Sequence, residues 1–453
     1  EAAFLQALAE IDGHFAIVLE TDTDYLVAVD RIRTFPIFLK NNNQNIQITD
    51  SIVFNGDTRN EAAIEYFKHT YCTLENTTLL KEWQQLQAGQ YAVITKNNKK
   101  HCIKNYYKHT AIIQNTSTEK RVEQLKESEK ALVEKIWKYA DGRTIVIPLS
   151  GGYDSRYLLA VLKQSNYPQI ECFTYGKTDS FEVLTAKKVC EQLQVKWHFV
   201  EYDDELLKLF FTEKWQQYAS LNHHYTSLPH EQDFFALHYL KERNIIPKEA
   251  VIMNGFCQDI HSGSYLEEKK KFNLYNHIFE KHAIKPILSA YENNWMGYRE
   301  WLIKNRLSKF IINSVRVYEY FGWDFYLPFW QKDWIEFWYS LKEEQLLHQH
   351  FYSEYLFSGI FKNYNIAIKK EDYPKSNKLT NIKQSLQPFI PNPVLRMLHT
   401  LKKQKKTDDI NNTFYLYNAL YNCTKEHPFI KDYKINNIHA LYLLQNLKNS
   451  NQL

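Results

Sequence analysis

The sequence predicts an α/β protein in which a parallel-sheet domain follows an antiparallel β segment. Residues 1–110 are mostly short apolar stretches separated by turn residues, whereas residues 118–253 alternate between helical and strand patterns. A glycine turn joins the first strand of this second part to a helix. With 453 residues, 44% of them hydrophobic and 24% charged, the chain has the composition of a globular protein of two or three domains.

The charge balance excludes some classes of partner. Lysine and arginine number 56, aspartate and glutamate 52, and the net charge is +4. This balance gives no electrostatic argument for binding nucleic acid or an anionic membrane. The longest apolar runs are strand-sized and fall well short of the ~18 residues of a bilayer span. We therefore expect neither nucleic acid nor a membrane among the partners.

The chain start and the cysteines bear on location. Residue 1 is Glu, and no basic segment followed by an apolar one comes after it, so no signal peptide is predicted. The six cysteines lack Cys-x-x-Cys or Cys-x-x-His spacing, which disfavours a zinc site and a disulfide framework. We expect reduced thiols in a cytoplasmic protein.

Alternating apolar stretches bounded by Asp, Asn, Thr and Gly indicate antiparallel strands with few helices in the first part. The expected strands are 14–19, 25–29, 35–39, 46–48 and 90–94.

A change of hydrophobic period at residue 118 predicts a helix, and strands and helices then alternate, which favours a parallel sheet with right-handed crossovers. The expected strands are 144–149, 170–175, 197–200 and 250–253, and the expected helical segments are 118–139, 157–162, 181–193, 204–220 and 231–243. Helical patterning and aromatic residues continue beyond this point.

The turn Ser-Gly-Gly-Tyr-Asp-Ser at residues 150–155 lies between an apolar strand and an apolar helix. Backbone N–H groups and a helix N-terminus converge at such a junction and bind anions. Gly151 and Gly152 permit a close backbone approach to a phosphate, and Ser150 and Ser155 add hydroxyl donors.

A carboxylate in such a turn needs its own explanation. Asp154 is compatible with a bound phosphate mainly if Mg²⁺ lies between the two negative groups. The alternative is an ordinary strand-to-helix turn in which Asp154 is the helix N-cap.

This hexapeptide resembles the pyrophosphate loop of the N-type ATP pyrophosphatases, or PP-loop enzymes, and the wider chain resembles the asparagine synthetase family. No Gly-Lys-Ser/Thr follows, so it is not a Walker A motif. The resemblance implies a PP-loop (adenine nucleotide α-hydrolase-like) fold that adenylates a carboxylate using ATP and Mg²⁺. It also implies that Ser150, Gly152 and Ser155 bind the nucleotide's pyrophosphate, that Gly151 belongs to the same nucleotide site and that Asp154 coordinates the metal.

Further matches follow in chain order. Residues 170–176 resemble the family's second strand, whose end lies beside the adenine, and this implies nucleotide binding at Tyr175. Gly255-x-x-x-Asp259-x-x-x-Gly-x-Tyr has the family's second signature spacing. It implies that Gly255 lies in the nucleotide site and that Asp259 is a second Mg²⁺ ligand. The alternative for Asp259 is a loop residue that caps a turn.

A lysine is expected to neutralise charge on the leaving pyrophosphate. The family carries it in a loop beyond a Pro-Phe-Leu-Asp motif, whose counterpart here is residues 328–331. Lys375 is the candidate, although Lys369, Lys370 and Lys378 compete for the role, and Lys375 is equally compatible with an exposed loop lysine.

The N-terminal part resembles the later half of a class II glutamine amidotransferase (NTN-type) domain. The matching stretches are residues 11–18, 29–38 and 87–91. That domain hydrolyses glutamine with an N-terminal cysteine. Residue 1 here is Glu, and Cys72 and Cys102 have no evident base. We interpret both cysteines as structural and expect no glutaminase centre in these residues.

The acceptor site departs from that of asparagine synthetases. Phe256, Cys257 and Ile260 replace Glu, Gly and an acidic residue of the second signature, and Asp324 and Tyr326 replace the family's Glu and Arg. Lost charges disfavour aspartate as the acceptor. Nearby aromatic residues either line a pocket for a larger, sugar-like substrate or belong to the core. They are Trp323, Phe325, Tyr326, Phe329, Trp330, Trp334, Phe337 and Trp338.

These observations favour a divergent asparagine synthase-like amide-forming ligase of three parts. Residues 1–115 are a partial amidotransferase-like domain, 120–390 the PP-loop domain and 391–453 a helical extension. Its substrates would be a small-molecule carboxylate and ammonia, glutamine or an amine. One alternative is a lactam- or macrocycle-forming relative, whose Tyr–Glu base dyad would need Tyr at the position of Phe256, so Phe256 disfavours it. The other alternative is a non-catalytic nucleotide-binding scaffold.

Overall fold

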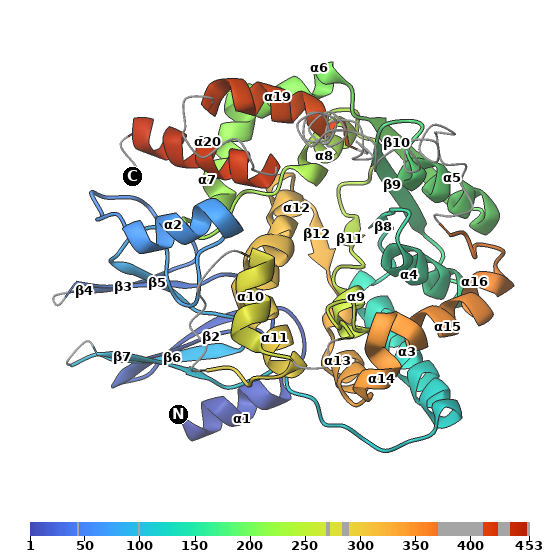
Figure 1. Cartoon of the computed structure of the whole chain (residues 1–453), viewed down its shortest axis with the longest axis horizontal. Helices are drawn as coiled ribbons and strands as arrows, with labels where there is room; N and C mark the ends of the chain where they lie inside the picture. The colour runs from blue at the N-terminus through green and yellow to red at the C-terminus, as the bar shows by residue number, and fades with distance from the viewer. Residues whose placement is uncertain are drawn as a thin grey trace, which may run out of the picture.

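The computed structural model describes residues 1–42, 45–97, 100–268, 272–282, 290–369, 411–424 and 435–450. An antiparallel β region and a parallel-sheet region lie side by side, and the C-terminal helices lie along the upper edge of both in Figure 1. Among the described residues, no helix has the length and apolar character needed to cross a membrane.

The antiparallel region contains two sheets that pack face to face. Within the described residues one sheet has the order β1-β2-β6-β7 and the other β4-β3-β5. Val27, Leu39 and Ile94 fill the space between them. The strands are β1 (Ala16–Glu20), β2 (Asp24–Val29), β3 (Phe38–Asn42), β4 (Asn45–Thr49), β5 (Trp83–Gln85), β6 (Gln90–Thr95) and β7 (His101–Asn105).

A buried aspartate shapes the corner between β2 and β3. The Asp30 carboxylate accepts the N–H groups of Phe15, Ile32 and Thr34 at 2.9–3.2 Å. The strand expected at 35–39 therefore begins only at Phe38. This corner is the Asp-Arg stretch on which the amidotransferase resemblance partly rests, and its hydrogen bonds give it a structural role.

Among the described residues of this region two helices accompany the strands, in keeping with the expectation of few helices. Helix α1 (Ala2–Glu10) covers the outer face of the first sheet through Phe4 and Leu8. Helix α2 (Glu61–Thr70) has Asn60 as its N-cap, whose side chain accepts the Ala63 N–H. The short strands β5 and β7 were not expected, because three to five residues carry little alternation.

The expected parallel sheet is confirmed. Within the described chain its strands have the order β10-β9-β8-β11-β12, and each neighbouring pair is parallel. They are β8 (Ile145–Pro148), β9 (Ile170–Gly176), β10 (Lys196–Glu201), β11 (Val251–Met253) and β12 (Asp324–Tyr326). Strand β8 lies between β9 and β11, so the strand order reverses there, and open α/β sheets bind ligands at the carboxyl ends beside such a reversal.

Helices cover both faces of this sheet. Figure 1 shows α4 (Tyr153–Gln164) and α5 (Phe181–Leu193) on one side and α8 (Gln232–Glu242) on the other, with α7 (Glu213–His223) farther from the strands. The other helices before residue 315 are α3 (Thr118–Ala140), α6 (Asp204–Leu207), η1 (Lys208–Phe211), α9 (Gln258–His261), α10 (Leu274–His282), α11 (Trp295–Leu302), the π-helical η2 (Ile303–Ile311) and η3 (Ile312–Val315).

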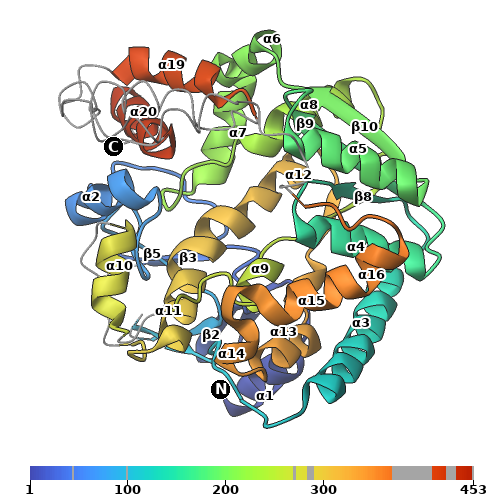
Figure 2. The ribbon, with the colours of Figure 1, turned by 45° about the vertical axis from the view of Figure 1, so that its right-hand side comes forward.

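The chain after β12 returns to the helices beside β8. Figure 2 shows α15 and α16 beside α3 and α4. The helices from residue 316 to 363 are α12 (Arg316–Tyr320), η4 (Pro328–Trp330), α13 (Lys332–Tyr339), α14 (Glu343–Leu346), η5 (Leu347–Gln349), α15 (His350–Ser358) and α16 (Ile360–Asn363).

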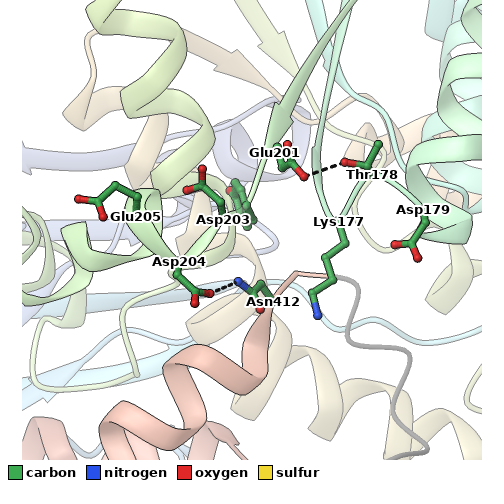
Figure 3. A pocket seen from close by; sticks show the side chains of 9 residues that line it. Lys177, Thr178, Asp179, Glu201, Asp203, Asp204, Glu205 and Asn412 are labelled. Carbon is green, nitrogen blue, oxygen red and sulfur yellow. Dashed lines mark hydrogen bonds between the residues drawn. The ribbon is translucent and has the colours of Figure 1, made fainter.

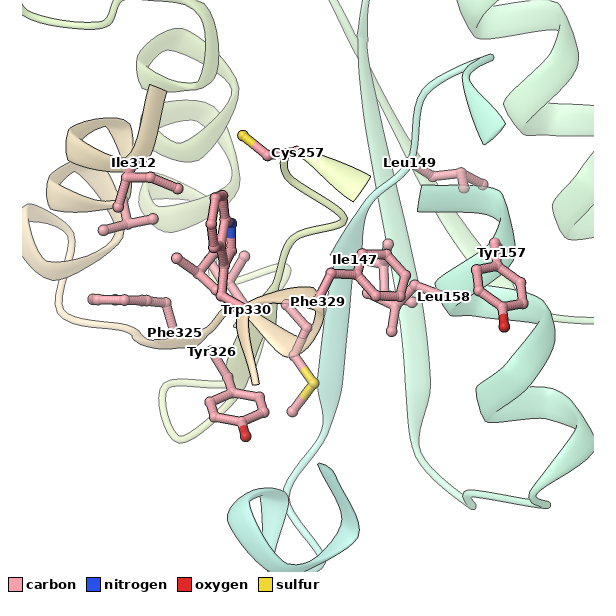
Figure 4. Packing of buried hydrophobic residues seen from close by; sticks show 14 of the residues in the cluster. Ile147, Leu149, Tyr157, Leu158, Cys257, Ile312, Phe325, Tyr326, Phe329 and Trp330 are labelled. Atoms are coloured by element: carbon pink, nitrogen blue, oxygen red, sulfur yellow. The ribbon is translucent and has the colours of Figure 1, made fainter. Parts of the chain in front are cut away.

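The aromatic residues around β12 form core. All eight that the sequence singled out are at most 8% exposed and belong to the main apolar cluster. Figure 4 shows Phe325, Phe329 and Trp330 in that cluster together with Ile147 of β8 and Leu158 of α4. The core interpretation is confirmed, and these side chains hold the sheet against its helices.

The C-terminal helices are α19 (Thr413–Thr424) and α20 (Ile435–Asn449). Ala440 and Leu443 of α20 share an apolar cluster with Ile64 and Phe67 of α2. Where it is described, the helical extension expected at 391–453 packs on the antiparallel region through α20 and on the main apolar cluster through Leu416 and Leu420 of α19. Residues 391–410 lie outside the described part.

Candidate functional site

The residues 150–155, called the glycine loop below, connect the end of β8 to the start of α4. Gly152 is the N-cap of α4, and no side chain caps the N-terminus of this helix. The Ser155 hydroxyl accepts the Ser150 N–H, and the Ser150 hydroxyl accepts the Gly152 N–H, both at 3.1 Å. The loop N–H groups thus point toward oxygen atoms at the positive end of a helix, which is the arrangement of an anion site.

A carboxylate already occupies one donor of the glycine loop. The Gly151 N–H donates a short hydrogen bond to the Glu182 carboxylate, which comes from the first turn of α5. The Phe181 ring covers the same glycine, and a Cβ on Gly151 would lie 2.8 Å from it. The loop therefore binds an anionic oxygen in this structure.

The loop after β11 meets the glycine loop because β8 and β11 are parallel neighbours, with Val251 opposite Ile145. A Cβ on Gly255 would lie 2.8 Å from the carbonyl carbon of Asp154 and 2.8 Å from the Ser155 nitrogen. Only glycine permits this approach. The structure therefore places Gly255 against the backbone of the glycine loop.

The approach of the two loops brings Asp154 and Asp259 together. The Asp259 N–H donates to the Asp154 carboxylate at 3.0 Å. The hydroxyl of Tyr352 donates to the other oxygen of Asp154 at 3.1 Å, and Ser264 donates to Asp259 at 3.0 Å. Because Gly152 is the N-cap and Asp154 lies inside α4, the alternative of Asp154 as N-cap is wrong.

The electrostatics of this pair favour a cation. Burial, and then the charge of Asp259, raises the pKa of Asp154 well above its ordinary value. Burial also raises the pKa of Asp259. A positive ion between the two carboxylates would offset both effects.

The donor set fits Mg²⁺. Among the described residues no group of three or more His, Cys, Asp or Glu side chains could hold a metal. Mg²⁺ is commonly held by one or two carboxylates, with water and phosphate oxygens completing its octahedron. Asp154 and Asp259 beside an anion-binding loop match that pattern.

Tyr175 lies at the carboxyl end of β9, on the wall of a pocket of about 220 Å³ that also includes Leu149, Ser150 and Glu182. Its ring stacks on Tyr202 with centroids 4.8 Å apart, and its hydroxyl donates to the buried carboxylate of Asp233. Because its hydroxyl is already hydrogen-bonded, Tyr175 can contact a ligand in this pocket through its ring and its backbone. Pro148, Phe173, Thr174, Gln232 and Asn411 complete the lining of the pocket.

A second pocket, of about 690 Å³, opens at the carboxyl ends of β9 and β10 (Figure 3). Its charged lining residues are Lys177, Asp179, Glu201, Asp203, Asp204 and Glu205. Five carboxylates against one lysine repel phosphate groups. This leaves the glycine loop as the better place for a triphosphate.

Comparison with known families agrees with this geometry. Residues 144–255 match the family model of the queuosine biosynthesis protein QueC. This stretch has the PP-loop fold. It spans β8 to β11, includes the glycine loop and Gly255, and ends before Asp259. The match covers less than half of the chain. No curated protein matches the sequence.

Expectations from the sequence also concern the cysteines and Lys375. All six cysteines are free, and burial raises the pKa of Cys72 to about 11, so that thiol is not an activated nucleophile. Cys102 is exposed on β7. Lys375 lies outside the described residues.

Two residues of the site, Glu182 and Tyr352, were not predicted from the sequence. Glu182 carries a weak signal, since it follows the N-cap Ser180 at the start of a helix. Tyr352 lies 198 positions from its partner Asp154. No local pattern connects these two residues.

Proposed function

We propose that this protein is an ATP- and Mg²⁺-dependent ligase of the asparagine synthase-like type. It would activate a carboxylate as an acyl adenylate and then transfer the acyl group to ammonia or an amine. The observation that carries this proposal is the pairing of Asp154 with Asp259 beside the glycine loop, at the carboxyl edge of a PP-loop sheet. A site for a bare phosphate would need no pair of adjacent carboxylates.

The proposed first step breaks the bond between the α-phosphorus and the oxygen that bridges it to the β-phosphorus. The substrate carboxylate attacks that phosphorus, and pyrophosphate leaves with the bonding electron pair. Mg²⁺, when bound, supplies charge neutralisation for the phosphates. The N–H groups of Gly151 and Gly152 and the hydroxyls of Ser150 and Ser155 would hold the departing pyrophosphate.

The second step forms the amide. The nitrogen lone pair attacks the acyl carbon, AMP leaves with the electron pair of the C–O bond, and the nitrogen loses a proton. Lys375 is our proposed source of positive charge for the first step, and Tyr175 the residue beside the adenine. Ammonia, an amine or glutamine would supply the nitrogen.

Exchange of labelled pyrophosphate into ATP tests this function. We expect exchange that depends on one member of a panel of small carboxylates and on Mg²⁺. Asp154→Asn should abolish it. A non-catalytic scaffold would instead bind nucleotide equally well in the wild type and in Asp154→Asn and would show no exchange with any carboxylate, and that result would refute the proposal.

A further inference from the structure

Arg156, the residue directly after the glycine loop, is fully buried at 0% exposure. It lies in the first turns of α4, with its guanidinium between the glycine loop and the chain that leaves α16. One nitrogen, Nη2, donates to the Gly151 carbonyl at 2.6 Å. The other, Nη1, donates to the carbonyls of Ile368 at 2.8 Å and Ile366 at 3.1 Å. The Arg156 side chain therefore bridges the glycine loop and the chain at 366–368, which lie more than 200 residues apart in the sequence.

The bond to Gly151 has a consequence for the anion site. A trans peptide is planar, so its C=O and N–H point in opposite directions. Holding the Gly151 carbonyl toward Arg156 turns the Gly152 N–H the other way, toward the Ser150 hydroxyl that it contacts at 3.1 Å. Two adjacent glycines have little intrinsic preference for this orientation. An external hydrogen bond from a cation supplies it.

The bonds to Ile366 and Ile368 fix the other segment. Lys369 follows directly, with its ammonium 4.9 Å from the centroid of the Phe357 ring. Phe357 in turn packs edge to face on Tyr153 of the glycine loop, with centroids 5.2 Å apart. The Arg156 guanidinium therefore links the segment 366–369 to the glycine loop. The Phe357–Tyr153 pair forms a second link between them.

We propose that Arg156 is a positioning residue that couples the anion-binding shape of the glycine loop to the placement of segment 366–369. An anion on the Gly152 N–H strengthens the hydrogen bond at the opposite end of the same peptide, because hydrogen bonds in a chain polarise one another. The tighter bond holds the guanidinium and, through it, residues 366–369. This inference rests on the proposed function, since it needs a phosphate group at the glycine loop.

Lysine at position 156 tests the coupling. Its ammonium keeps the charge but lacks the planar fork that reaches carbonyls on two sides. Arg121→Lys is the matched control, because Arg121 is also buried and also holds carbonyls, those of Ser340 and Gln114 at 2.8 and 2.7 Å. It has no contact with the glycine loop in the structure. Circular dichroism would establish that both variants fold.

The readout is hydrogen–deuterium exchange of residues 364–369 with and without saturating magnesium pyrophosphate, together with the affinity from calorimetry. In the wild type and in Arg121→Lys we expect the ligand to slow this exchange by about fivefold or more. In Arg156→Lys we expect about tenfold weaker binding and no slowing at saturation.

Three results would overturn the inference, and they are distinguishable. Equal slowing in Arg156→Lys would refute the coupling and leave the proposed function intact. Binding to the wild type without slowing at 364–369 would do the same, and this arm needs no variant to fold. Failure of magnesium pyrophosphate to bind the wild type would instead refute the proposed function, and the coupling with it.

Discussion

The backbone N–H of Asp259 donates a hydrogen bond of 3.0 Å to the carboxylate of Asp154. The two residues are 105 positions apart in the chain. They meet because each follows one of two neighbouring parallel strands, β8 and β11, and because Gly255 lets the second loop reach the backbone of the first. The proposed metal site depends on this contact between the two loops.

Removing one charge of this pair should stabilise the metal-free protein. An aspartate whose pKa is raised on folding contributes stability below its ordinary pKa, and this contribution is lost as the pH rises through the raised value. At neutral pH the pair therefore destabilises the fold. We expect Asp154→Asn to raise the free energy of unfolding, because the neutral amide lacks the charge that burial and Asp259 disfavour.

Urea unfolding at pH 7 in EDTA measures this effect. Asp22→Asn, at an exposed turn residue, is the control and should leave the stability unchanged. A loss of stability in Asp154→Asn would show that the hydrogen bonds of the Asp154 carboxylate outweigh its repulsion from Asp259. That result would contradict a pair that needs a cation to offset its charge.

Metal affinity should fall on acidification. Protons compete with Mg²⁺ for carboxylates, and the raised pKa values of Asp154 and Asp259 move this competition toward neutral pH. Below the raised pKa we expect the affinity for magnesium pyrophosphate to fall by up to about tenfold per pH unit. Calorimetry between pH 5 and 8 measures the slope. The same slope in Asp154→Asn would rule out this residue as its source.

Glu182 should compete with bound phosphate. Its carboxylate holds the Gly151 N–H, so a phosphate oxygen must displace it to use that donor. We expect Glu182→Gln to bind magnesium pyrophosphate several-fold more tightly, because a neutral amide is a weaker competitor and repels phosphate less. Glu191→Gln, an exposed change on the same helix, should have no effect. Weaker binding in Glu182→Gln would mean that the carboxylate supports the loop.

Gly255 should tolerate no side chain. A Cβ there would lie 2.8 Å from two backbone atoms of the glycine loop, so alanine must push the two loops apart. We expect Gly255→Ala to weaken binding of magnesium pyrophosphate by about 100-fold, by separating the carboxylates. Gly56→Ala, at a positive φ of 66° where a Cβ meets nothing within 4 Å, is the control for backbone strain away from the site. Unchanged binding in Gly255→Ala would contradict the proposed metal geometry.

Lys375 should act in the first chemical step. Lys375→Ala should keep its affinity for ATP and lose about 100-fold or more in pyrophosphate exchange, as expected for a group that stabilises developing charge. Lys378→Ala is the comparison. Normal exchange in Lys375→Ala would show that another lysine has this role.

Much of the parallel region could be predicted from the sequence because its elements are long and bounded by clear signals. The helix expected at 181–193 has those bounds, and the strand expected at 170–175 extends one residue further. The glycine loop was recognisable because the chemistry lies in six consecutive residues. Asp259 followed from a signature spacing after a short buried strand.

The rest depends on contacts that the local sequence does not encode. The three-residue strand β12 forms because it pairs with β11. Its short aromatic sequence does not by itself distinguish a strand from a helix. Tyr352 reaches Asp154 from α15, and the Glu182 carboxylate reaches Gly151 from α5. Such partners are set by how the helices pack on the sheet, so these two members of the site became visible only in the structure.

The most direct test of the central claim is calorimetric binding of pyrophosphate with and without Mg²⁺, in the wild type and in Asp259→Asn. The account predicts that the wild type binds pyrophosphate only with Mg²⁺ and that Asp259→Asn binds it about 100-fold more weakly. Binding that is unaffected by Mg²⁺ or by the loss of the Asp259 charge would contradict it.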